Sequence, residues 1–251
     1  MNVLPVSVRL ALWASAALGG RLPVADVVGR AHPDVDAVDG DLDRISLWQD
    51  LGERVVLVAL PRPGDVTGMP RSSPELLAAA TAAGECVYVP GLGGALVPTV
   101  AAYGPVGDRG TLVTWTAYEA EPVPPHRVEA MSLAEADLQL RLSMREITGE
   151  LDHLDVRPFA GDPARSRVEA RLADRGWGLP EGVPPRATQV LSTAARMAAA
   201  AETALEAASP ALVASADASR QALLRQLRAL ADSTLAVAAN VAALHLAGLR
   251  R

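Results

Sequence analysis

The residues best suited to bind a small ligand lie in one loop, from Arg62 to Ser73. The guanidinium groups of Arg62 and Arg71 stand there beside the hydroxyl groups of Ser72 and Ser73. Pro74 favours the first turn of a helix, so free backbone N–H groups are expected at the end of this loop. Arginine side chains and such N–H groups both bind phosphate or carboxylate. The loop therefore predicts a small-anion site, and the alternative is an ordinary connector rich in Pro and Gly.

A second group of polar residues surrounds His126. A histidine beside carboxylates can act as a general acid or base, or help to hold a metal ion. Neither the HExxH nor the HxH spacing is present, so an exposed loop histidine is the alternative. The members of this secondary cluster are His126, Arg127, Glu119, Glu121 and Glu129.

An acidic stretch earlier in the chain has five aspartates within ten residues, from Asp34 to Asp43. A calcium-binding EF-hand loop places acids at positions one, three and five and a glycine at position six. Counted from Asp34, position five is Val38 and position six is Asp39, so the pattern fails. We expect a solvated acidic loop and no metal site.

The glycine-rich segment Gly91 to Gly94 follows an apolar run, as a phosphate-binding loop would. The residues after it include valines and Pro98, which favour a strand over a helix. Without a helix behind the glycines, the segment lacks the N–H groups that bind phosphate. It is predicted to be a hairpin turn.

Composition excludes several classes of function. All 23 cationic residues are arginine, which excludes a Schiff-base lysine and a P-loop lysine. This bias is typical of a high-GC coding sequence. Residues 1–160 carry 12 arginines against 21 acidic residues, so nucleic-acid binding is not expected. Cys86 is the single cysteine, so no disulfide within the chain is possible, and a reducing, cytoplasmic location is expected.

The front half of the chain predicts a sheet with packed helices. Apolar runs at 54–60 and 86–90 predict two strands, and the segment from Ser73 to Gly84 predicts a helix between them. We expect this βαβ unit to have parallel strands. Two further strands, near 95–103 and 111–121, are expected to form hairpins. In the last, Val113, Trp115 and Ala117 share one face. The fold class is therefore α+β, with a mixed sheet of about four strands.

The back half predicts helices. Ser132 and Glu135 form a capping box for a helix that runs to about Val156. A further helix is expected at 163–176, followed by two Ala-rich helices that pair as an antiparallel hairpin. We predict two domains, an α+β domain at 1–158 and a helical region at 159–251.

The last helix carries more apolar surface than one neighbouring helix can cover. We expect either the α+β domain or a second copy of the chain to cover it, and favour a homodimer through the C-terminal helices. Its positions 221, 225, 228 and 232 are predicted to face water. The uncharged run at 233–249 is short for a membrane span, and a buried helix is expected. The residues Val6, Leu10, Trp13 and Ala17 predict a core-facing stripe on the first helix rather than a cleaved signal.

These observations favour a non-catalytic interaction or regulatory protein that self-associates through its C-terminal helices. The alternative is an enzyme or sensor that binds a small anion at the Arg62–Ser73 loop. No cofactor is expected, and neither nucleic acid nor a membrane is an expected partner.

Overall fold

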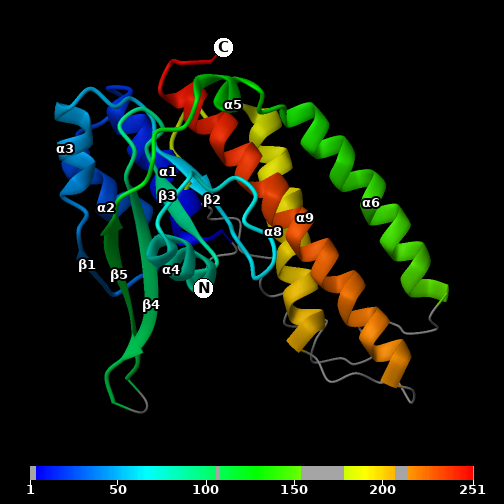
Figure 1. The fold of residues 1–251 in the computed structure, drawn as a ribbon. Coiled ribbons are helices and arrows are strands. Elements are labelled where there is room, and N and C mark those ends of the chain that lie inside the picture. Colours follow the sequence, from blue (N-terminus) through cyan, green and yellow to red (C-terminus); the bar gives the residue numbers. More distant parts are fainter. Residues whose placement is uncertain (1–3, 106–107, 154–177, 207–213, 251) are drawn as a thin grey trace.

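The computed structural model describes residues 4–105, 108–153, 178–206 and 214–250, and it confirms the α+β class (Figure 1). The helix predicted at 163–176 lies outside these residues. The five strands, in chain order, are β1 (Ala37–Gly40), β2 (Leu57–Ala59), β3 (Cys86–Tyr88), β4 (Ala95–Tyr103) and β5 (Gly110–Tyr118). They form one sheet in the order β1, β5, β4, β3, β2.

The extra strand comes from the acidic stretch, which was predicted to be a solvated loop. Strand β1 pairs in parallel with β5, with Ala37 opposite Leu112 and Gly40 opposite Trp115. The aspartates beside β1 act as hydrogen-bond acceptors. The carboxylate of Asp36 accepts from the Thr111 N–H at 2.6 Å, and that of Asp41 accepts from the Ala117 N–H at 2.8 Å. Side-chain bonds therefore hold an edge strand whose composition is unfavourable for one.

The prediction of a parallel βαβ unit is wrong, because β2 and β3 pair antiparallel. Ala59, at the end of β2, lies opposite Cys86, at the start of β3. The connection between them, which includes helix α4 (Pro74–Ala83), therefore leaves and returns at the same end of the sheet. A crossover to the opposite end is what a parallel pair would require.

The glycine-rich segment is a turn between β3 and β4, as predicted. The Val89 N–H donates to the Gly94 carbonyl at 3.1 Å, and β3 and β4 are antiparallel. Gly93 and Gly94 have positive φ angles of 79° and 106°, a region that favours glycine. The hairpin of β4 and β5 is also confirmed, and Val113 and Trp115 are buried on its inner face.

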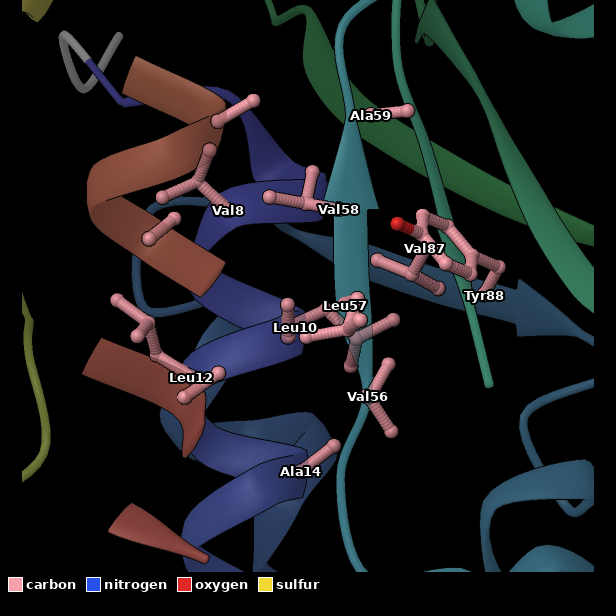
Figure 2. Close-up of a cluster of buried hydrophobic side chains, with 14 of the residues drawn as sticks. Val8, Leu10, Leu12, Ala14, Val56, Leu57, Val58, Ala59, Val87 and Tyr88 are labelled. Carbon is pink, nitrogen blue, oxygen red and sulfur yellow. The ribbon is translucent and has the colours of Figure 1, made fainter. Parts of the chain in front are cut away.

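Helix α1 (Val6–Leu18) is buried on nearly all sides, which the predicted single stripe did not anticipate. Val8, Leu10 and Leu12 are each fully buried. Figure 2 shows the reason, since α1 lies between helix α9 (Ala214–Leu246) and strand β2. Two stripe positions, Val6 and Trp13, are only partly buried. The helix therefore serves as the central layer between the sheet and the C-terminal helices.

Short helices complete the N-terminal part. They are the 3-10 helix η1 (Val24–Asp26) and the helices α2 (Val27–Ala31), α3 (Arg44–Asp50) and α5 (Pro125–Glu129).

The C-terminal part contains α6 (Leu133–His153), α8 (Pro185–Glu206) and α9. Ser132 caps the start of α6, where the Glu135 N–H donates to the Ser132 hydroxyl at 3.3 Å; this is one of the two hydrogen bonds of the predicted capping box. Helices α8 and α9 lie side by side and run in opposite directions, so the predicted hairpin is confirmed (Figure 1).

The surplus apolar surface of α9 is covered within the chain. Helix α9 packs against α1, α6 and β2 in addition to α8. Leu224, Ala231, Leu235, Ala238 and Ala242 are all buried, and only Leu249, beyond the helix, is exposed. By length and composition α9 could cross a membrane, but it is packed here as a core helix. The homodimer stays a prediction. The apolar face of α9 that first suggested it is not exposed in the structure.

The outer edge of β2 is closed by two side chains. The Ser15 hydroxyl of α1 bonds both the N–H and the carbonyl of Val56, at 3.0 and 2.9 Å. The Asn240 side chain of α9 accepts from the Val58 N–H at 2.7 Å and donates to the Val58 carbonyl at 3.0 Å. All of these groups are buried, where an unpaired peptide group is costly. The sheet edge therefore depends on residues far away in the sequence.

Candidate functional site

The four residues predicted to bind an anion do not converge. Ser73 caps helix α4 by accepting from the Leu76 N–H at 3.3 Å. Ser72 forms a bridge with Ala120, and the Arg71 carbonyl accepts from the Glu121 N–H at 2.9 Å. Arg62 instead extends toward α9 and bonds Asp232. The backbone at Arg71 thus lies beside the Glu119–Glu121 segment, while Arg62 belongs to another part of the molecule.

The secondary cluster around His126 is exposed to solvent. His126, Arg127 and Glu129 lie on α5, and Glu119 and Glu121 lie on the segment before it; all five are exposed. Among the described residues, no group of three metal-ligating side chains comes together. The cluster therefore does not form an enclosed site.

Arg62 is part of a partly buried ion-pair network that joins the two halves of the chain. The Asp232 Oδ2 atom accepts from Arg62 Nε at 2.7 Å and from Arg228 Nε at 2.9 Å. Arg228 also pairs with Glu202 of α8, with 3.2 Å between Nη1 and Oε1. Asp232 is 1% exposed, so the prediction that positions 228 and 232 face water is wrong. Both residues face Arg62. The spacing of residues along the helix could not predict this contact, because Arg62 is distant in the sequence.

The guanidinium of Arg62 lies against Gly84, at the end of α4. A Cβ atom at Gly84 would lie 2.3 Å from Arg62 Nη1, and the glycine has a φ of 75°. The positive φ angle favours glycine at this position, and the glycine leaves room for the guanidinium of Arg62. This contact places Arg62 beside Glu85, the next residue in the chain.

Arg9 supplies a further guanidinium, from the buried helix α1. It is 2% exposed and forms an ion pair with Asp34. Its Nε atom is buried and has no hydrogen-bond partner in the part of the chain that the structure describes. An unpaired buried N–H of a charged group is costly, so this atom is a strong candidate for contact with a ligand.

Arg9, Arg62 and Arg228 all line one cavity, of about 230 Å³. We call it the junction cavity. Three carboxylates, from Asp34, Glu85 and Glu202, also line it. Its apolar walls include Val6, Val35 and Ala199. A wider cavity of about 600 Å³ shares Arg62, Glu202 and Arg228 with it, so the ion-pair network borders both spaces.

Glu85 has opposing influences on its ionisation. Burial raises its pKa above the ordinary value. The Ser7 N–H, which donates to Glu85 Oε2 at 2.8 Å, acts in the opposite direction, as do the charges of Arg62 and Arg9. Both arginines therefore lie within electrostatic range of Glu85.

Cys86, the one cysteine of the sequence, is not among the residues that line this cavity. Cys86 is fully buried, and burial raises the pKa of its thiol to about 12. A thiol with such a pKa is protonated at neutral pH and is a poor nucleophile. The charged side chains that line the cavity are suited to binding a molecule with charged groups.

His32 is held as a neutral side chain in the core. Its Nδ1 atom lies 2.9 Å from the Val28 carbonyl, and its Nε2 atom accepts from Trp115 Nε1 at 3.2 Å. This pattern places the proton on Nδ1. Burial lowers the pKa of His32 below its ordinary value of 6.5, and the charge of Arg9 acts in the same direction.

This environment predicts a loss of stability in acid. Because the folded pKa is lowered, the unfolded chain binds the proton first, so the contribution of His32 is complete above pH 6.5 and falls as the pH drops below it. Between pH 7.5 and 5.5, the unfolding free energy of the native protein should fall by about 1 kcal/mol more than that of His32→Gln. Urea unfolding of both proteins at the two pH values measures this. Equal losses would contradict it.

Of the residues that line the junction cavity, Arg62 is the one that the sequence predicted to bind a small ligand. Arg9 offered the clearest signal, because it is the one charged residue in the apolar run from Val3 to Leu18. Glu85, Glu202 and Arg228 carried no local signal, since their roles depend on long-range packing.

Comparison with known proteins identifies both halves of the chain. The model of the Rv1486c-like protein, N-terminal domain, matches residues 7–130, and that of the Rv1486c-like protein, C-terminal domain, matches residues 134–244. The two matches follow each other in order and span most of the sequence, so the chain belongs to the Rv1486c-like proteins. No curated protein and no solved structure matches it. The junction cavity is lined by residues of both matched domains.

Proposed function

We propose that this Rv1486c-like protein is a non-catalytic binding protein whose junction cavity holds a small molecule with a carboxylate or phosphate group. The observation that carries the proposal is Arg9, a buried residue of the cavity lining whose Nε atom has no hydrogen-bond partner among the described residues. Arginine is well suited to such groups, because its donors match their geometry. We further propose that the protein acts in the cytoplasm.

The size of the cavity limits the ligand. Cavities for drug-sized molecules measure about 300–1,000 Å³. The junction cavity, at about 230 Å³, suits a smaller molecule. Its apolar walls, among them Val6 and Val113, favour a ligand with a short aliphatic part.

The position of the cavity supports a regulatory role. Arg9, Arg62 and Glu85 come from the N-terminal part, whereas Glu202 and Arg228 come from α8 and α9. A ligand held between them would stabilise the folded state, and the stabilisation would rise with ligand concentration.

Ligand binding is tested by thermal unfolding and calorimetry with succinate, inorganic phosphate and 4-aminobutyrate as probes. At least one should raise the melting temperature of the native protein. Arg9→Met keeps most of the aliphatic volume but removes the donors, and should weaken binding at least ten-fold. Arg62→Met, at a more exposed residue, is the second variant if Arg9→Met does not fold.

The matched control is Arg71→Met, an exposed arginine outside the junction cavity. It should bind the same probe with native affinity. If no probe binds, the proposed function is wrong. If Arg71→Met loses binding while Arg9→Met keeps it, the ligand occupies the Arg62–Ser73 loop instead.

A further inference from the structure

The charges around the junction cavity are balanced. Among the described residues, three guanidinium groups and three carboxylates line it. A ligand with only negative charge would approach Asp34, Glu85 and Glu202 as well as the arginines. Because a partly desolvated like-charge contact is unfavourable, this lining selects against a simple anion.

Two groups at the cavity have incomplete pairing. The first is Arg9 Nε, a buried donor without a partner. The second is Glu85. Asp34 pairs with Arg9 and Glu202 pairs with Arg228, but Glu85 forms no ion pair with any described residue. Its Oε2 atom accepts from the backbone N–H of Ser7.

Resting on the proposed function, we infer that the ligand is a small zwitterion with an aliphatic body, such as an amino acid. Its carboxylate binds the guanidinium group of Arg9 and its ammonium group binds Glu85. A molecule of zero net charge does not alter the balance of positive and negative charges in the lining. It can still pair with both Arg9 and Glu85. Arg62 and Arg9 both act on the ionisation of Glu85, so the two binding points belong to one electrostatic environment.

The experiment compares four probes of one size by calorimetry with the full chain. They are 2-aminobutyrate and 4-aminobutyrate, which are zwitterions, butyrate, which lacks the amine, and butylamine, which lacks the carboxylate. One of the zwitterions should bind at least ten-fold more tightly than butyrate and butylamine.

Substitutions test which residue binds the carboxylate end and which binds the ammonium end of the ligand. Glu85→Gln retains an oxygen that can accept from the Ser7 N–H, and should weaken binding of the zwitterion about ten-fold while leaving butyrate unchanged. Arg9→Met should weaken both. Glu121→Gln, at an exposed glutamate outside the junction cavity, is the control for Glu85→Gln and should bind as the native protein does.

The outcomes separate this inference from the proposed function. Butyrate binding as tightly as either zwitterion, and lost in Arg9→Met, overturns the inference and retains a carboxylate site. Tightest binding of butylamine overturns the inference, as does unchanged zwitterion affinity in Glu85→Gln. If none of the four probes, succinate or phosphate binds, the proposed function is wrong as well.

Discussion

Replacing Asn240 by leucine is expected to destabilise the protein by roughly 3 kcal/mol, because the variant leaves two buried peptide groups unpaired. The Asn240 side chain is 4% exposed and bonds both the N–H and the carbonyl of Val58. Leucine has similar bulk but can neither donate nor accept. The edge of β2 is packed against both α1 and α9. Urea unfolding monitored by circular dichroism measures the change.

The control for this variant lies on the same helix. Gln226 is an exposed amide of α9, so Gln226→Leu makes the same chemical change outside the core. It should alter the unfolding free energy by less than about 0.5 kcal/mol. A shift in melting temperature of roughly 6–12 °C is expected for Asn240→Leu. Equal effects of the two variants would show that Asn240 does not close the edge of β2.

Local sequence patterns were sufficient to predict most helices and hairpins. Each of the features that were predicted correctly involves residues a few positions apart in the sequence. Examples are the helix caps at Ser132 and Ser73 and the spacing of small residues in α8 and α9. Such signals depend on backbone conformation and on one buried face, which the sequence records directly. The turn at Gly93 and Gly94 belongs to the same class.

Features that depend on distant partners were not predicted. Strand β1 was missed because its aspartates are typical of a loop, and they are satisfied by backbone N–H groups of β5. The antiparallel pairing of β2 with β3 could not be read from an element order that is also typical of a parallel unit. Asp232 occupies a helix position that appears solvent-facing until Arg62, 170 positions away, is placed beside it.

The same distinction applies to the candidate site. Arg62 was chosen because it lies in a loop with Arg71, Ser72 and Ser73, but its partners come from α9. Those neighbours in sequence have structural roles at the start of α4 and beside Ala120. Of the four residues predicted to bind an anion, Arg62 is therefore the one that lines the junction cavity. Its other members required the packing of α8 and α9 against the N-terminal part.

That packing depends on Asp232, and the substitution Asp232→Ala is expected to destabilise the protein by about 2 to 3 kcal/mol. It leaves Arg62 and Arg228 facing each other without the carboxylate that pairs with both. Removing one member of a buried ion pair costs about 3 to 5 kcal/mol, and the partial exposure of Arg62 reduces this cost. Asp232→Asn keeps the size of the side chain and one acceptor, so a smaller loss is expected.

Two comparisons make the Asp232 result specific. Asp137 forms a similar ion pair with Arg141, four residues later on α6, where the arginine is 58% exposed. Asp137→Ala should therefore cost less than about 1 kcal/mol. Adding Arg62→Met and Arg228→Met to Asp232→Ala should restore part of the lost stability, because the uncompensated charges are removed. If Asp232→Ala costs no more than Asp137→Ala, the network does not hold the two parts together, and the junction cavity lacks the rigid wall that selective binding requires.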